Sequence, residues 1–354
     1  MRARRLLIAL LMGACALGGG GLRAADCPPE GNVKFICGVM APEDLVAIPG
    51  GEWVIASGYS GGPIHLISAR DYTVTPLFPG SKPLSRPDTR AYAACPGPLD
   101  PNEREKFSAH GINVRPGSNG VHTLYVVHHG FRESIEVFEI DVKAKPPVFT
   151  WIGCVVAPET ATLNAMAPLP DEGFVATNPY RRSDPNARNR ALAGGESGEI
   201  WEWHAAGGWK IVPGSEGPGP NGIEVSKDGR WIYVNFWPAN KVWRLSRGQA
   251  SVQKTEIDVP FHPDNIRWQP DGSLLSAGHY APTNARATEC LRVNCNDAAA
   301  RIARIDPKTM KAQQVVDYPS NAFFFGATAA LQVGREIWIG SVRGDRVARY
   351  AERR

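Results

Sequence analysis

Apolar and polar positions alternate along this chain in short segments, and the segments repeat one template. Each repeat starts at a polar or turn residue, runs through a few apolar positions into a turn rich in Pro, Gly or Asp, and leaves on a second apolar segment. Turns such as Pro49-Gly50-Gly51 and Pro270-Asp271-Gly272 supply the backbone conformations that tight hairpins require. Six repeats begin at Asp44, His110, Asn164, Asn221, Asn265 and Phe325.

A further segment of alternating pattern follows each hairpin, for example over residues 135–142 and 241–246. Alternation of apolar with charged residues is what a strand with one buried face requires, and we expect these segments to be the outer strands. Repeats of roughly 50 residues built on a strand–turn–strand core are typical of a β-propeller. The sequence therefore predicts an all-β fold, with residues 25–354 forming a single six-bladed β-propeller.

The first 24 residues have the pattern of a secretory signal. Arg2, Arg4 and Arg5 precede an apolar run, and a Gly-rich stretch ends at Ala24. The run is too short to span a membrane, and no later stretch approaches about 20 apolar residues. We therefore expect residues 1–24 to be removed, and the mature chain to be periplasmic or secreted and to have no integral membrane segment. Lipoprotein processing at Cys15 is the alternative.

Charge narrows the range of partners. The formal charge of +4 comes from the basic residues of the predicted signal, so the mature chain is close to neutral. A neutral chain argues against nucleic acid and anionic membrane surfaces as partners. A small molecule is the expected partner.

Six of the seven cysteines lie beyond the signal. An even number in an exported chain predicts disulfides, whose connectivity spacing alone does not decide. Cys290 and Cys295 are close enough to close one loop, and Cys27 with Cys37 could pin the N-terminal segment. A zinc site is the rival interpretation, and the lack of any CxxC pair argues against it.

Polar residues recur where the repeats begin. Because equivalent positions of successive blades surround the central channel, these side chains are expected to lie together. They offer carboxylate and amide oxygens, which suit a hard cation such as Ca²⁺. The rival interpretation is that Asn and Asp before a strand make local turns with the backbone. The residues concerned are Glu43, Asp44, Asn164, Asn221, Asp264 and Asn265.

Histidines suggest the accompanying chemistry. His110 begins the second repeat and could act as a general base on water. His128 and His129 end the second strand of that repeat, and because neighbours on a strand face opposite sides, only one can approach His110. His279, at a matching place in the fifth repeat, could line the mouth of the channel, and a structural role is the alternative. The chain has no GxSxG motif and no Gly-rich phosphate loop, which argues against serine hydrolase and nucleotide chemistry.

The chain resembles the paraoxonase/arylesterase family, within the wider group of SMP-30/gluconolactonase proteins. The resemblance rests on motifs in order along the chain, among them Pro42-Glu43-Asp44-Leu45, Ala109-His110-Gly111-Ile112, Leu163-Asn164, Pro220-Asn221-Gly222-Ile223 and Asp264-Asn265-Ile266. It implies a six-bladed propeller with two calcium ions in its channel. It also implies hydrolysis of lactones and aryl esters, and in some members of organophosphate triesters.

Carried over residue by residue, the resemblance implies a catalytic calcium and a histidine dyad. The dyad falls on His110 and His129. The second calcium of the family uses an Asp directly after Asn164, where this chain has Ala165, so one calcium is expected and the second lacks a full ligand set, although Asp44 could contribute. The implied ligands of the catalytic calcium are Glu43, Asn164, Asn221, Asp264 and Asn265.

The chain departs from the family pattern in one further disulfide, and alternative functions stay open. A family disulfide to the last strand has no partner here, where Ala351 stands, so closure of the propeller must rely on strand pairing. Three irregular stretches, residues 83–108, 180–197 and 280–296, could roof the channel mouth and select the substrate. The hypothesis is a calcium-dependent lactonase or arylesterase. Its rivals are a gluconolactonase-like sugar-lactone hydrolase and a non-catalytic propeller that binds a ligand or partner.

Overall fold

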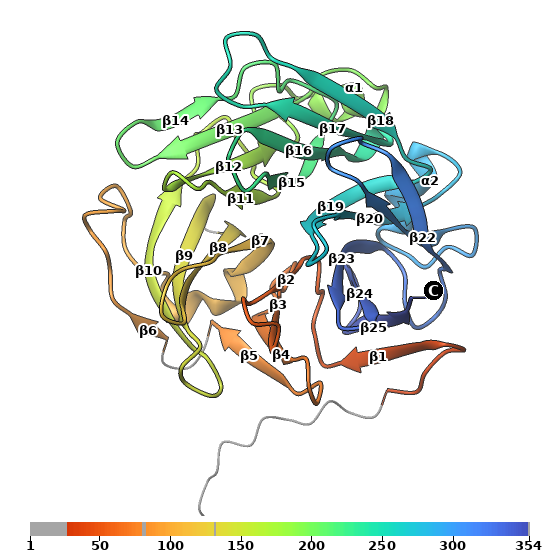
Figure 1. The fold of residues 1–354 in the computed structure, drawn as a ribbon, viewed down its shortest axis with the longest axis horizontal. Coiled ribbons are helices and arrows are strands. Elements are labelled where there is room, and N and C mark those ends of the chain that lie inside the picture. The colour runs from red at the N-terminus through yellow and green to blue at the C-terminus, as the bar shows by residue number, and fades with distance from the viewer. Residues whose placement is uncertain (1–26, 80–82, 131, 353–354) are drawn as a thin grey trace, which may run out of the picture.

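The computed structural model describes residues 27–79, 83–130 and 132–352, and shows a six-bladed β-propeller (Figure 1). The predicted signal and Cys15 lie outside the described residues. Apart from one short parallel strand, the strands pair antiparallel within six sheets, and the sheets are arranged around a central axis. The prediction of an all-β propeller is confirmed.

In each of the first three blades, four strands follow one another in chain order from the innermost strand outward. Blade 1 comprises β2 (Leu45–Ala47), β3 (Trp53–Ala56), β4 (Ile64–Ser68) and β5 (Val74–Phe78). Blade 2 comprises β7 (Ser108–Arg115), β8 (Val121–His129), β9 (Ser134–Asp141) and β10 (Val148–Val156), with β6 (Leu84–Ser85) added parallel to β10. Blade 3 comprises β11 (Met166–Pro168), β12 (Gly173–Asn178), β13 (Glu199–His204) and β14 (Gly208–Ile211).

The remaining blades follow the same order until the last, which takes its outermost strand from the start of the described chain. Blade 4 comprises β15 (Pro220–Val225), β16 (Trp231–Phe236), β17 (Lys241–Ser246) and β18 (Lys254–Asp258). Blade 5 comprises β19 (His262–Trp268), β20 (Leu274–Tyr280), β21 (Ala299–Ile305) and β22 (Ala312–Pro319). Blade 6 comprises β23 (Ala327–Val333), β24 (Glu336–Ser341), β25 (Arg346–Ala351) and β1 (Val33–Cys37).

The six innermost strands form a closed ring, because β2, β7, β11, β15, β19 and β23 each contact the next and β23 contacts β2. Closure of the fold comes from strand pairing, as expected. In blade 6, β1 pairs antiparallel with β25, from Val33 opposite Tyr350 to Cys37 opposite Arg346. The chain ends are thereby tied into one sheet.

One prediction about strand order was wrong. The alternating segments expected as outer strands are the third strands of their blades, and a fourth strand lies outside each. The fourth strands β14 and β18 are short and largely exposed, with one partly buried residue in β14 and two in β18. Their weak apolar pattern explains why the sequence does not reveal them.

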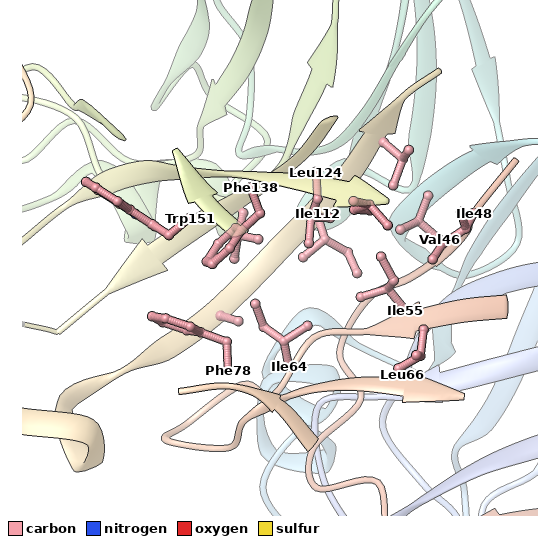
Figure 2. Packing of buried hydrophobic residues seen from close by; sticks show 14 of the residues in the cluster. Val46, Ile48, Ile55, Ile64, Leu66, Phe78, Ile112, Leu124, Phe138 and Trp151 are labelled. Atoms are coloured by element: carbon pink, nitrogen blue, oxygen red, sulfur yellow. The ribbon is translucent and has the colours of Figure 1, made fainter. Parts of the chain in front are cut away.

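Packing between blades supplies the core. Six clusters of buried apolar side chains each join two neighbouring blades. Figure 2 shows the cluster between blades 1 and 2, where Ile55, Leu66 and Phe78 face Leu124 and Phe138. Because both faces of a blade are covered, a strand such as β4 is buried at every position. Truncating a core residue, for example Leu124→Ala, would cost about 2–5 kcal/mol.

Three disulfides join the six described cysteines. Cys27–Cys37 and Cys290–Cys295 are bonded as the spacing suggested, and Cys95 bonds Cys154 of β10. Three disulfides indicate an oxidising, exported environment. Over the described part of the chain, no helix is both long and apolar enough to cross a membrane.

Short helices lie in the three irregular stretches. They are η1 (Pro101–Lys106), α1 (Ala187–Leu192) and α2 (Asn284–Cys290). A further short helix, η2 (Trp237–Ala239), follows β16. These elements matter for function because some of them border the pocket described next.

Candidate active site

A pocket of about 300 Å³ opens at one end of the channel, where the inner strands begin. Two of the three irregular stretches contribute walls, through Tyr180 and Arg188 of one and Leu291 of the other. The stretch 83–108 contributes no lining residue. The pocket floor carries polar side chains from several blades, among them Glu43, His110, His129, Asn164, Asn221, Asp264 and Thr328.

β-Bulges aim three of these segments into the channel. The register of the inner hairpin shifts at the same place in blades 2, 4 and 5. A bulge leaves residues unpaired and redirects their side chains, and bulges are enriched beside functional sites. The dipeptides within the three bulges are His110-Gly111, Asn221-Gly222 and Asp264-Asn265.

Glycine in two of these dipeptides allows neighbouring blades to approach closely. A Cβ at Gly222 would lie 2.3 Å from the carbonyl oxygen of Asp264. A Cβ at Gly111 would lie 2.6 Å from the carbonyl oxygen of Asn164. Any side chain at either position would push apart the strands that bring the polar groups together.

The amides of the three asparagines are oriented by their neighbours. Asn265 Nδ2 donates to Glu43 Oε1 at 2.8 Å. Asn164 Nδ2 lies 3.4 Å from His110 Nε2, and the Asn221 side chain bonds Asp264. Because each amide nitrogen is directed at a neighbouring side chain, each amide oxygen points in another direction and needs a different partner.

Those amide oxygens have no partner within the protein. Four buried oxygens of the predicted ligand set accept no hydrogen bond: Glu43 Oε2, Asn164 Oδ1, Asn221 Oδ1 and Asn265 Oδ1. Leaving one buried acceptor unsatisfied costs about 1–3 kcal/mol, so four in one place require a common partner. All four are oxygens, which a hard cation prefers.

The electrostatics of the Glu43 and Asp264 carboxylates also favour a cation as the common partner. Burial raises the pKa of Glu43 well above its usual range, and the nearby charges of Asp264 and Asp44 raise it further. Burial likewise raises the pKa of Asp264 well above its usual range, with a further contribution from Asp44. Two buried carboxylates facing each other favour protonation, or a positive charge placed between them.

Five residues therefore fit a calcium ion: Glu43, Asn164, Asn221, Asp264 and Asn265. Two carboxylates and three amide oxygens match the preference of Ca²⁺ for oxygen ligands in irregular geometry. A zinc site has no such support. Within the described ranges, the one close group of three His, Cys, Asp or Glu ligands is Cys290, Cys295 and Asp297, and its cysteines are joined in a disulfide.

A chain of three hydrogen-bonded side chains runs from the pocket wall toward the predicted cation ligands. Glu133 Oε2 lies 3.0 Å from His129 Nδ1, and His129 Nε2 lies 2.9 Å from His110 Nδ1. The carboxylate accepts from His129, which leaves His129 Nε2 to accept from His110. His110 Nε2 then carries a lone pair, which faces Asn164 Nδ2 at 3.4 Å and lies 3.8 Å from Glu43 Oε1.

His110 is held in the neutral form needed to accept a proton. Burial lowers its pKa well below the usual range, and the neighbouring His129 lowers it further. The ring of Tyr59, another pocket residue, packs on His110 with the centroids 4.6 Å apart. The geometry therefore presents an oriented, unprotonated imidazole beside the predicted cation ligands.

The structure does not bring every predicted residue to the pocket. Asp44 faces away from the other predicted ligands, because its Oδ1 accepts from Leu45 N and its Oδ2 from Ile112 N and Arg267 Nη2. His128 faces the opposite side of β8 from His129, as strand alternation requires, and its Nδ1 lies 3.0 Å from the carbonyl oxygen of Arg132.

His279 does not line the pocket, which leaves the structural role. It is buried between Trp237 and His262, with Nε2 3.3 Å from the carbonyl oxygen of Ala287 in α2. The helix that covers it could not be placed from the repeat pattern, because α2 belongs to one of the irregular stretches.

Sequence reasoning missed four residues of the site region. Glu133 lies in the turn after β8, where a carboxylate four residues beyond His129 is the only signal. Thr328 Oγ1 donates to the carbonyl oxygen of Glu43 at 2.6 Å, and it lies in the blade 6 bulge that matches the other three. Tyr59 and Arg267 carry no signal in the repeat pattern.

Comparison with known proteins shows the fold. No family model matches the chain. Luciferin-regenerating enzyme aligns with a TM-score of 0.53 and 13% identity, over 90% of this chain and 94% of that protein. A candidate gluconolactonase aligns with a TM-score of 0.53 and 12% identity, over 92% and 94%.

A third solved structure, the PQQ-bound aldose sugar dehydrogenase of Streptomyces coelicolor, aligns with a TM-score of 0.51 and 15% identity, over 91% and 98% of the two chains. At these identities the likeness shows a shared propeller architecture. What the site does must be argued from its own residues.

Proposed function

We propose that this protein is a calcium-dependent hydrolase of lactones or aryl esters. The observation that carries the proposal is the convergence of four unpartnered buried oxygens with an oriented imidazole at the floor of one pocket. The resemblance to the paraoxonase/arylesterase pattern supports it. So does the presence of a candidate gluconolactonase among proteins of the same architecture.

The residues divide the work of ester hydrolysis between them. A bound calcium would polarise the substrate carbonyl and offset negative charge on its oxygen. His110 Nε2 accepts a proton from the attacking water, and His129 accepts the hydrogen bond from His110 Nδ1 as the imidazole becomes positive. Glu133 stabilises that positive charge from the far end of the chain. Tyr59, Leu291 and Trp237 give the pocket the apolar surface that a lactone ring or an aryl group would contact.

A sugar lactone is the nearest alternative substrate. The pocket also carries Thr162, Tyr180 and Arg188, whose polar groups suit a hydroxylated ring. A pocket of about 300 Å³ is at the small end of the range for ligand sites, which favours a small lactone over a long-chain one.

The test is a hydrolysis panel with the mature protein. γ- and δ-lactones, a sugar lactone, acyl-homoserine lactones and phenyl acetate would be assayed in calcium and in chelator. We expect at least one lactone or ester to turn over in calcium, with loss of the rate in chelator and recovery on adding calcium back. If no compound turns over although calcium is bound, a non-catalytic binding propeller replaces the proposal.

A further inference from the structure

The guanidinium of Arg267 lies buried inside the channel, two residues beyond Asn265 along β19. Only 2% of this residue is exposed. It donates to oxygens from the inner strands of four blades, or from the residue that precedes such a strand. The acceptors are the carboxylates of Asp44 and Glu224 and the carbonyl oxygens of Leu45, Ile112 and Ile266.

The contacts use all three nitrogens of the side chain. Nε donates to the carbonyl oxygen of Leu45 at 3.1 Å, and Nη1 donates to that of Ile266 at 3.1 Å. Nη2 donates to Asp44 Oδ2 and to the carbonyl oxygen of Ile112. Glu224 Oε1 lies 3.4 Å from Nη1.

The network reaches a fifth blade through Asn113. Its Nδ2 donates to Glu224 Oε1 at 3.3 Å and lies 3.4 Å from the carbonyl oxygen of Met166 in β11. The inner strands of blades 1 to 5 therefore meet at one buried positive charge. Burial raises the pKa of Glu224 to about 7, while Arg267 lowers it. Burial also raises the pKa of Asp44, while Arg267 and the hydrogen bonds from Ile112 and Leu45 lower it. The guanidinium therefore offsets part of the cost of burying both carboxylates.

The oxygens around Arg267 are of the kind that hold a hard cation. Two carboxylates and three backbone carbonyls form an oxygen shell typical of calcium sites. Here the positive charge is a guanidinium, whose planar donors satisfy carbonyl and carboxylate oxygens together and which stays charged at every relevant pH. Asp44 was suggested by the sequence as a ligand of a second metal ion. Its two oxygens already accept hydrogen bonds, Oδ1 from Leu45 N and Oδ2 from Ile112 N and Arg267 Nη2.

We infer that Arg267 is a built-in replacement for a second channel cation. It neutralises Asp44 and joins the inner strands where a second metal ion would otherwise be needed. Ala165, which stands where the family resemblance implies an Asp, is fully buried and adds no further negative charge to the inner strands. The inference concerns the layer below the proposed catalytic site and does not depend on catalysis.

Two consequences separate this role from that of an ordinary ion pair. The wild-type chain has no second metal site, so its tightly bound calcium does not exceed one ion. Removing the guanidinium while keeping its acceptors leaves an oxygen cage that binds a divalent cation in its place.

The experiment compares metal content and melting temperature in three proteins. Arg267→Ala keeps the acceptors and opens space. Arg267→Lys keeps the charge. Arg267→Ala with Asp44→Asn removes the charge and its main partner together. Calcium per chain is measured by elemental analysis after dialysis, and melting is followed with calcium and with chelator.

We expect Arg267→Ala to bind one calcium more than wild type and to recover in calcium most of the melting temperature that it loses in chelator. Arg267→Lys and the double variant should show no such gain. If Arg267→Ala is insoluble in chelator, purification in millimolar calcium is the measurement, and soluble protein with the extra ion supports the inference. Insolubility in both conditions contradicts it.

Two tightly bound ions in wild type would overturn the inference, as would an Arg267→Ala protein that is destabilised equally with and without calcium. The readout is the difference of one ion between variant and wild type. It therefore stands even if the upper site binds no calcium and the proposed function fails.

Discussion

Replacing Asp264 by Asn should remove most of the stabilisation that the protein gains from calcium. In wild type, Glu43 and Asp264 are buried carboxylates with raised pKa values and with unpartnered oxygens around them. Without a cation, the two carboxylates destabilise the channel mouth. Asp264→Asn keeps the shape and removes one charge, so in chelator the variant should melt at or above the wild-type temperature. In calcium it should melt below wild type.

The size of the calcium-dependent shift in melting temperature follows from the linkage between calcium binding and folding. Calcium at about 100 times its dissociation constant stabilises the native state by about 2.7 kcal/mol. With about 2 cal/mol/K of unfolding entropy per residue, a chain of this length has an unfolding entropy near 0.7 kcal/mol/K, so calcium should raise the melting temperature by about 4 °C. If losing one carboxylate weakens binding about 100-fold, the same calcium concentration stabilises by about 0.4 kcal/mol, or less than about 1 °C.

The assay is thermal unfolding followed by circular dichroism, in calcium and in chelator, for wild type, Asp264→Asn and Glu136→Gln. Glu136 is a matched control, because its buried carboxylate is already paired with Arg132, Ser134 and Trp151. Glu136→Gln should lower the melting temperature equally in both conditions. A wild-type protein that is indifferent to chelator, or an Asp264→Asn variant with the full calcium shift, would refute the cation site.

Three further predictions test the base, the pocket and the core. His110→Gln should keep the calcium-dependent shift in melting temperature and lower kcat by about 10²–10⁴-fold. His128→Asn, on the opposite face of β8, should keep the wild-type rate. Equal rates for wild type and both variants in the hydrolysis panel would exclude His110 as the general base. Arg188→Met should reduce kcat/KM by up to about fivefold for lactones that carry a carboxylate and leave neutral lactones unchanged, which steady-state kinetics on matched substrates would show. Burial lowers the pKa of His65 to about 4. The contribution of His65 to stability is therefore complete above pH 6.5 and is lost as the pH falls through 4, with a loss of about 3 kcal/mol at pH 4. Urea unfolding of His65→Gln should show a correspondingly weaker pH dependence than that of wild type.

The sequence reveals the parts of this fold that repeat, and misses the parts that occur once. The inner hairpins are visible because alternation and turn chemistry recur in each blade. The positions of Asn164 and Asn221 follow from that recurrence, since equivalent positions surround the channel. The outermost strands are missed because half-exposed strands carry little apolar signal, as the pattern of β18 illustrates.

Single contacts between distant residues lie beyond such reasoning. Arg267 and Asp44 are 223 residues apart in sequence, and the repeat pattern does not show that they pair. Glu133 is similar, because nothing in a turn between two strands indicates that its carboxylate will reach a histidine. These contacts depend on side-chain reach within a packed channel, which the repeat pattern does not encode.

The two charged layers of the channel differ in a way that bears on function. The lower layer is complete, since Arg267 and Asp44 satisfy each other without an external ion. The upper layer is incomplete, and its unpartnered oxygens lie at the floor of a pocket beside an oriented histidine. A metal kept only for stability would be expected in the buried lower layer, where a guanidinium already supplies the charge. The proposed cation would instead lie in the accessible layer, within reach of a proton acceptor, where a substrate could contact it. This difference favours the proposed hydrolase over a passive binding propeller.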